Sequence, residues 1–345
     1  MRFLMLSVLI LIQFQSLLAQ QKKVVTGGRE IAITLTPLKN CTVYLGSYFG
    51  KGMTLVDSTR LDQNSKGVFK GPNKLTTGIY FVVSPTYTIQ FELLMDQQQR
   101  FTIQADTSAK ESAIIKGSPD NDLFKDYAGF SNEKGRMLQQ LKLALQSANG
   151  AEADKIRVSI ANTEKEIKQY QTNIHKTKPT SLLSALFYIM QRPELPPVPI
   201  VKGKPDSAYP YQYVKQHYWD NVLFNEDRLL RTPFFEPKLD EYFKYYVSAD
   251  PDSIISEVKQ MLLMARTGKE IYPYLLTKFT NKYINPEFMG QDKVFVYLFE
   301  NSNAYLSKNN SKKQALLQIL LKLSEKDISW DTTKDKIRDG FKEIN

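Results

Sequence analysis

Cysteine is nearly absent from this 345-residue sequence, which contains only Cys41. A lone cysteine cannot form an internal disulfide, a C-x-x-C redox pair or a thiolate zinc cluster. In the segment NCTVYLG it begins an apolar run that is typical of a β-strand. We therefore interpret Cys41 as a packed residue, with a functional thiol as the alternative.

Histidine is also scarce, with only His175 and His217, so a multi-histidine metal site is not expected. The sequence contains neither G-x-S-x-G nor H-E-x-x-H. In GSYFGKG three residues separate the first two glycines, whereas a P-loop needs four, and Gly52 follows the lysine in place of Ser or Thr. Carboxylates are plentiful, so a glycosidase-type acid pair and an unrecognised hydrolase stay open. The sequence predicts no catalytic residue, no cofactor and no metal.

Long apolar runs are missing, because a membrane span takes roughly 20 apolar residues and the run Leu4–Ile12 is interrupted soon afterwards. That run follows Arg2 and precedes the segment LLA, which ends at Ala19. This order is typical of a secretory signal peptide over residues 1–19. Glutamines occupy positions 20–21, where a lipoprotein needs cysteine. We expect a soluble exported protein of the periplasm or cell envelope, without a transmembrane segment.

Acidic residues are outnumbered by basic ones, 36 to 46, which gives a formal charge of +10. The lysines are scattered among acids, as in NTEKEIKQYQTNIHKTK, and no zinc-finger or RNP-like pattern accompanies them. We therefore expect no nucleic-acid binding. A mildly basic solvated surface, attracted to anionic envelope polymers, accounts better for the charge.

Strand-like runs fill the sequence from about Arg29 to Lys116, among them EIAITLT, GIYFVVS and RFTIQAD. Turn signals such as Gly50 to Gly52 separate the runs. Many short strands without helical pattern between them predict an antiparallel β-sandwich-like domain over residues 22–117, with an open barrel as the alternative.

Helical periodicity replaces the strand pattern at Ser118, a predicted N-cap followed by proline. Two segments with an apolar face, separated by SANGAEAD, predict an antiparallel helical hairpin with a coiled-coil-like seam. The expected seam residues are Leu138, Leu141, Leu145, Ala148, Ile156, Ile160, Thr163, Ile167, Tyr170 and Ile174. Asp250 before proline predicts the start of a later helix. The fold class is thus α+β, with an all-helical domain over residues 118–306 and a lysine-rich amphipathic tail over 307–345.

Proline is concentrated in PELPPVPIVKGKPDS, residues 193–207. This density favours an extended, polyproline-like loop inside the helical region. A peptide read by a proline-recognition partner is the functional alternative.

The segment HYWDNVLFNEDRLLRTPFF brings His217, Trp219, Arg228 and Arg231 close together in the sequence. An exposed tryptophan beside a guanidinium would stack on a sugar ring or peptide, so these four residues are weak candidates for a ligand-binding site. The interpretation we favour is packing, because aromatic-rich segments are more often core than site. In that interpretation Trp219 packs a corner with Phe224, Leu229, Leu230, Phe234 and Phe235, and the arginines pair with Asp220, Glu226 or Asp227.

The same segment, with DPDSII and YLLTKFTNKYINPEFMGQDKVFVYL, resembles the helical middle module of exported bacterial thioredoxin-like proteins, which include thiol:disulfide interchange proteins. VYLGSYFGKGMTLVDSTRLD, GVFKG and FTIQADT are similar to the β module that opens such chains. The resemblance covers roughly Val24 to Leu306, and both modules are domains of unknown function. It implies a following thioredoxin-like domain with a C-x-x-C pair. After Leu306 this sequence has no cysteine, so no catalytic residue of the family maps onto it.

The leading expectation is an exported, non-enzymatic envelope protein that corresponds to the partner-presenting half of a thioredoxin-like oxidoreductase system. Its expected partner is a protein or an envelope polymer. Two alternatives stay open: an envelope protein that binds glycan or peptide, and a thioredoxin-like oxidoreductase that has lost its catalytic domain. The sequence leaves the oligomeric state undetermined.

Overall fold

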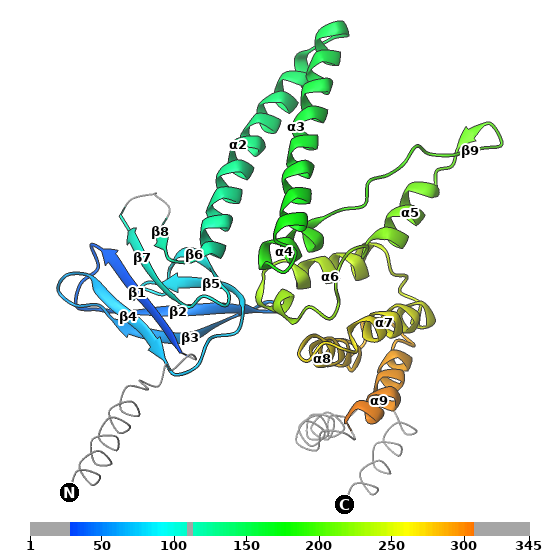
Figure 1. The fold of residues 1–345 in the computed structure, drawn as a ribbon. Coiled ribbons are helices and arrows are strands. Elements are labelled where there is room, and N and C mark those ends of the chain that lie inside the picture. The colour runs from blue at the N-terminus through cyan, green and yellow to red at the C-terminus, as the bar shows by residue number, and fades with distance from the viewer. Residues whose placement is uncertain (1–27, 109–112, 307–345) are drawn as a thin grey trace, which may run out of the picture. The chain divides into compact units, whose positions relative to one another are not determined.

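The computed structural model of the chain describes residues 28–108 and 113–306 and has an α+β fold, with strands first and helices afterwards (Figure 1). Two compact units make up the chain. The first runs to Thr177 and includes Ser181–Leu183, and the second contains Lys178–Thr180 and continues from Ser184. The predicted signal peptide and C-terminal tail lie outside the described residues. The predicted domain boundary at residue 117 stays a prediction.

The N-terminal β region forms two four-stranded sheets whose inner faces share one apolar core, with Ile31, Leu45, Phe69 and Leu93 fully buried. Cys41 packs against this core, partly buried, as the packing interpretation expects. The sheet orders are β4 (Lys66–Gly71), β1 (Arg29–Thr36), β7 (Arg100–Asp106), β8 (Ile114–Lys116), and β3 (Gly52–Arg60), β2 (Thr42–Phe49), β5 (Gly78–Val83), β6 (Ile89–Met95).

One strand pair differs from the predicted antiparallel arrangement. β1 and β7 run parallel, with Ile31 opposite Phe101 and Ile33 opposite Ile103. The other described pairs are antiparallel. The chain visits the other sheet between β1 and β7, so a crossover rather than a hairpin joins them, and a crossover permits a parallel pair.

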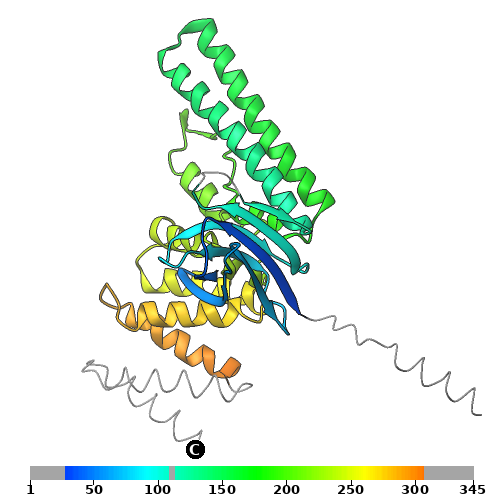
Figure 2. The ribbon, with the colours of Figure 1, turned by 90° about the vertical axis from the view of Figure 1, so that its left-hand side faces the viewer.

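The predicted helical hairpin is confirmed as α2 (Pro119–Ser147) and α3 (Gly150–Thr177), which run side by side in both ribbon views (Figure 2). The rings of Phe130 and Tyr170 stack across the seam with centroids 4.4 Å apart. The Thr163 hydroxyl lies 3.5 Å from the sulfur of Met137. Among the predicted seam residues, Thr163 and Ile174 are buried, and the others are half-buried.

Asn121, in the first turn of α2, connects this helix to the edge of the sandwich. Its side-chain carbonyl accepts a hydrogen bond from Leu94 N at 2.8 Å, and its amide nitrogen donates to Leu94 O at 2.8 Å. The same amide donates to the Ser118 hydroxyl at 2.8 Å. Ser118 is the N-cap residue, as predicted, but its hydroxyl makes no capping bond to the backbone and accepts from Asn121 instead. A side chain thus completes the hydrogen bonding of strand β6.

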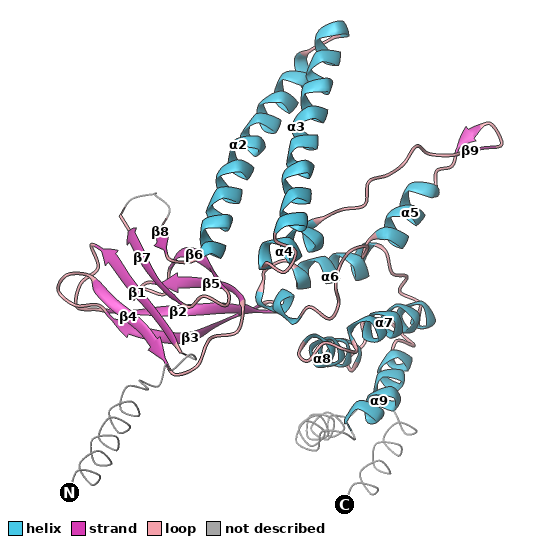
Figure 3. Cartoon of the chain, viewed as in Figure 1, coloured by secondary structure: helices cyan, strands magenta, loops and turns pink. Residues whose placement is uncertain are grey.

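The second unit is helical apart from one short β-ribbon (Figure 3). Its core includes the fully buried rings of Phe187, Phe235, Phe279 and Phe295. The predicted cap is confirmed, since the Asp250 carboxylate accepts from Ser253 N at 2.8 Å. No helix within the described ranges is long and apolar enough to span a membrane. The elements of the second unit are α4 (Leu182–Met190), whose first two residues are grouped with the first unit, β9 (Ile200–Val201), β10 (Lys204–Pro205), α5 (Tyr209–His217), the 3-10 helix η1 (Asp227–Arg231), α6 (Phe235–Tyr245), α7 (Pro251–Ala265), α8 (Ile271–Tyr283) and α9 (Asp292–Leu306).

Candidate functional site

Aromatic rings of α5 and α6 and the residues just after these helices form one cluster in the second unit. Tyr218 lies 5.1 Å from Trp219, 5.0 Å from Tyr242 and 5.1 Å from Tyr246, measured between ring centroids. Trp219 also meets Phe224 edge-on at 5.0 Å. Such edge-to-face and tilted contacts stabilise a core beyond the area that they bury. We call Tyr218, Trp219, Tyr242 and Tyr246, with Lys238 among them, the aromatic cluster.

Lys238 is the unusual member of the aromatic cluster, because its ammonium group lies among rings. The nitrogen is 4.8 Å from the Tyr218 ring centroid and 5.8 Å from that of Trp219. Both distances suit a cation–π interaction. Burial, aided by the nearby charge of Arg192, lowers the pKa of Lys238 to about 8. A lysine with so low a pKa is a recognised mark of functional sites.

The hydroxyls of Tyr218 and Tyr242 stay protonated through the physiological range. Burial raises the pKa of Tyr218 above its ordinary value, and the negative charge of Glu241 adds to the effect. Burial likewise raises the pKa of Tyr242, whose hydroxyl donates to Glu257 at 2.9 Å. These phenols therefore act as hydrogen-bond donors and packing surfaces.

Lys238 and its helix hold the start of the proline-rich segment. The Lys238 ammonium donates to Gln191 O at 2.7 Å. One residue further on, the Arg192 guanidinium donates twice to the Glu241 carboxylate, at 2.8 and 3.0 Å. A bidentate pair fixes both position and orientation. The chain therefore leaves α4 and enters the proline-rich segment at a place set by α6.

The end of the same segment is held by Tyr246, another member of the aromatic cluster. Tyr211, in the first turn of α5, stacks on Tyr246 with centroids 5.7 Å apart, and its hydroxyl donates to Tyr246 O at 3.3 Å. Lys215 pairs with Glu257 of α7 at 3.2 Å. Both ends of the segment thus meet one cluster.

Between these two anchors the chain is extended and largely exposed. Figure 1 shows β9 at the tip of a long connection between α4 and α5. Ile200 and Val201 pair with the β10 residues Pro205 and Lys204. Lys202 and Gly203 both have positive φ, at 51° and 75°, as a type I′ hairpin turn requires. The predicted extended loop is therefore present, and its tip forms a β-ribbon with two residues in each strand. We call residues 193–206 the presented loop.

The four candidate ligand-binding residues lie in two places. His217, whose Nδ1 is 2.7 Å from Asp220, and Trp219 lie at the end of α5. Arg228 and Arg231 lie on η1, where Arg228 pairs with Glu226 at 2.7 Å and Arg231 with Glu270 at 2.6 Å. Pairing with Glu226 agrees with the packing interpretation, whereas Glu270 was not among the expected partners.

Trp219 is half-buried and holds an unusual polar atom. Its indole Nε1 is buried and has no hydrogen-bond partner. An unsatisfied buried donor costs roughly 1–3 kcal/mol, so such a group is rare and merits a reason. Of the four candidate residues, Trp219 alone belongs to the aromatic cluster, and the proposed ligand site stays a prediction.

Sequence reasoning missed Lys238 and Asp227 as key residues. Asp227, considered only as an arginine partner, accepts from Lys269 N at 3.0 Å and from Glu270 N and Ile271 N at 2.9 Å. It thereby caps the start of α8, although at least 42 positions separate it from these residues in the sequence. A Ser, Thr, Asp or Asn directly before a helix, or an S-x-x-E pattern there, signals a cap, but a cap supplied by a distant segment leaves no local signal.

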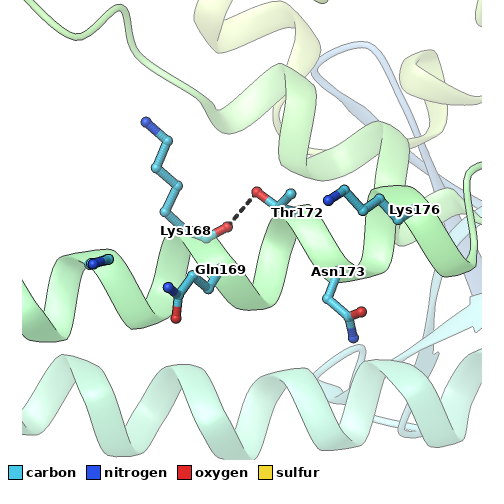
Figure 4. A pocket seen from close by; sticks show the side chains of 6 residues that line it. Lys168, Gln169, Thr172, Asn173 and Lys176 are labelled. Atoms are coloured by element: carbon cyan, nitrogen blue, oxygen red, sulfur yellow. Dashed lines mark hydrogen bonds between the residues drawn. The ribbon is translucent and has the colours of Figure 1, made fainter.

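A basic surface lies on α3 in the first unit. Lys165, Lys168, Gln169, Thr172, Asn173 and Lys176 line an open hollow of about 420 Å³. Figure 4 shows these side chains along one stretch of the helix, with the Thr172 hydroxyl donating to Lys168 O at 2.8 Å. The three lysines fit the expected basic solvated surface. In the described part of the chain, no three His, Cys, Asp or Glu side chains gather as metal ligands would.

Two parts of the chain match known domain families. Residues 30–124 match a domain of unknown function, DUF4369, which covers most of the sandwich and the first residues of α2. Residues 159–323 match a second domain of unknown function, DUF5106, which begins within α3 and covers the later helices. No curated protein matches the chain. The predicted pairing of a β module with a helical module, both of unknown function, is confirmed, and the thioredoxin-like association stays a prediction.

Lys238 makes the stability of the second unit depend on pH. Its folded-state pKa of about 8 lies below the ordinary value of 10.5, so between these values the unfolded chain binds more protons than the folded chain. Stability therefore rises as pH rises through this window, and below it the contribution is constant. We expect the urea midpoint to increase from pH 7 to about pH 9.5, before tyrosine ionisation opposes it.

Lys238→Met removes this increase, because the titrating group is gone. Lys244→Met is the matched control, since Lys244 lies on the same helix but is exposed. Equal pH dependence of the urea midpoint in the two variants would show that Lys238 is not the group responsible.

Proposed function

We propose that this chain is an exported, non-catalytic envelope protein that binds a partner protein through the presented loop. The proposal rests on the structure of this loop, which is an extended, largely exposed segment held at both ends by one aromatic cluster. Its tip exposes Ile200 by 66% and Val201 by 51%. Exposed apolar side chains favour binding because a partner can bury them. A preordered segment favours it as well, because less conformational entropy is lost on association.

Proline density adds to this preorganisation. Four prolines lie between Pro193 and Pro199, and proline restricts the backbone of the free loop as well as of the bound one. Extended proline-rich segments are a recurrent mode of peptide recognition by aromatic grooves. The presented loop would thus serve as the recognised element, and its partner would supply the groove.

The signal-like N-terminus supports export, and the resemblance to the first two modules of thioredoxin-like proteins supports a role in presenting a partner to a redox system. In this account the second unit holds the partner, and any dithiol chemistry belongs to another chain or domain. Dithiol-dependent reduction of insulin by the purified chain alone would contradict the non-catalytic part of the proposal.

Capture from native envelope extract tests the binding role. We expect the wild-type chain to capture a discrete protein, and the double variant Ile200→Ser, Val201→Ser to lose it, since the apolar tip is removed without touching the anchors. Val158→Ser on α3 is the matched control, because Val158 is a valine of similar exposure, 59%. Capture that survives in the double variant would place binding elsewhere on the chain.

A second candidate function is the binding of a glycan or peptide at Trp219. The Nε1 donor without a partner favours it, because a ligand that displaces the rings packed around Trp219 would bring an oxygen to this buried donor. Trp330 is the other tryptophan, so a Trp330→Phe chain reports on Trp219 alone. The emission maximum of Trp219 in that chain should shift when soluble peptidoglycan fragments are added. Emission that stays at short wavelength and responds to neither the fragments nor a quencher would rule out ligand binding at Trp219.

A further inference from the structure

Each sheet of the sandwich has two edge strands, and the four edges differ in how they are protected from pairing with another strand. The sheet orders put β4 and β8 at the edges of one sheet, and β3 and β6 at the edges of the other. An edge strand presents unpaired N–H and C=O groups that pair readily with another strand. Folded proteins therefore blunt their edges with charges, short strands or covering elements.

Three of the edges carry such protection. β4 exposes Lys66 and Lys70, and lysine is a common guard of an edge. β8 is only three residues long. On β6, the Asn121 side chain occupies both the N–H and the C=O of Leu94.

The fourth edge, β3, is protected over only half of its length. Towards its end, Asp57 pairs with Arg29 of β1 at 2.7 Å, and the Thr59 hydroxyl accepts from Val68 N at 3.1 Å. The first half, Gly52–Val56, contains no charged residue. Its hydrogen-bonded neighbour among the described strands is β2 alone.

This first half is also apolar and exposed. Met53 is 60% exposed and Leu55 44% exposed, and both point to the same side of the strand because they are two positions apart. Leu45 pairs with Asp57 and Gly46 with Leu55, which leaves Val56 as an extra residue and ends the regular segment there. We call Gly52–Leu55 the open edge.

We propose that the open edge pairs with the open edge of a second copy of this chain, in an antiparallel two-fold arrangement centred on Thr54. In this register Met53 of each copy lies opposite Leu55 of the other, so four apolar side chains meet on one face. The two Thr54 side chains meet on the other face, and cross-strand threonine pairs are favourable. No like charges are brought together within the segment. The two sheets become one continuous sheet across the dimer.

Disulfide trapping tests the register directly. Thr54→Cys, in the chain without residues 1–19, should form a covalent dimer under mild oxidation at least about tenfold faster than Val68→Cys, because pairing raises the effective concentration of the facing thiols. Val68 is a matched control, since it is 44% exposed on the lysine-guarded edge. The unsubstituted chain, with Cys41, gives the baseline. Equal rates for the two variants would overturn the proposal.

Sedimentation equilibrium over a concentration series supplies the second measurement. We expect a monomer–dimer equilibrium whose dissociation constant rises at least about tenfold in Leu55→Lys and, independently, in Met53→Lys. Both side chains are exposed, so each variant should keep the wild-type circular dichroism. At concentrations where the wild-type chain is monomeric, each variant should also keep the wild-type unfolding midpoint. A chain that is monomeric at every concentration, or a dimer that both lysine variants leave intact, overturns the self-pairing. Such a monomer would leave the open edge to an extended segment of another protein.

Discussion

We expect Asn121→Ala to lower the free energy of unfolding of the first unit by about 3 kcal/mol, because it leaves two buried backbone groups unsatisfied at a cost of roughly 1–3 kcal/mol each. The N–H and C=O of Leu94 lose their partner, and Leu94 is only 1% exposed, so water cannot replace the amide. The Ser118 hydroxyl loses a donor as well.

Urea unfolding followed by circular dichroism measures the loss, and amide exchange at Leu94 locates it. Asn162→Ala, at an exposed position of α3, is the matched control and should change stability by less than about 0.5 kcal/mol. If Asn121→Ala unfolds at the wild-type urea concentration with Leu94 still protected, the amide does not hold α2 to the sandwich.

The second large effect is expected at Asp227. Asp227→Ala should destabilise the second unit by about 2–3 kcal/mol, since one carboxylate that caps three backbone N–H groups is lost. The start of α8 then has no side-chain cap of its own, because Glu270 makes none. A Cβ added to Gly268 would lie 3.1 Å from an Asp227 carboxylate oxygen, so the backbone before α8 passes close to this carboxylate and the site has little room to rearrange.

Thermal unfolding of Asp227→Ala and Asp220→Ala compares two aspartates of the same segment. Asp220 is exposed and contacts His217, an i, i+3 pair at the surface, so its loss should cost less than about 1 kcal/mol. Equal destabilisation of the two variants would mean that the cap on α8 contributes no more than a surface pair.

The elements that could be predicted are those with local signals. The hairpin followed from its seam and its break at SANGAEAD, and α7 followed from Asp250 and Pro251, because a cap acts within four residues of itself. The β region followed from short β-branched runs and turn residues. The parallel pairing of β1 with β7 could not be predicted, since it joins residues about 70 positions apart after a crossover.

The candidate site was predicted only in part for the same reason. Trp219 and His217 attracted attention as rare residues within one segment. Lys238 is a common residue type whose surroundings come from Gln191, Tyr218 and Trp219, up to 47 positions away. A lowered lysine pKa results from burial in the folded structure, so no spacing of residues in the sequence predicts it.

The proposed function depends on the presented loop, so the most direct test is to identify what the tip of this loop contacts. A photoreactive amino acid at position 200 should crosslink one discrete protein in native envelope extract, while the same group at position 158, on α3, should not. The crosslinked peptide identifies the partner surface, which we expect to be an aromatic-lined groove. Labelling of the same proteins from both positions, or none from position 200 in a folded chain, would contradict the claim that this loop binds a partner.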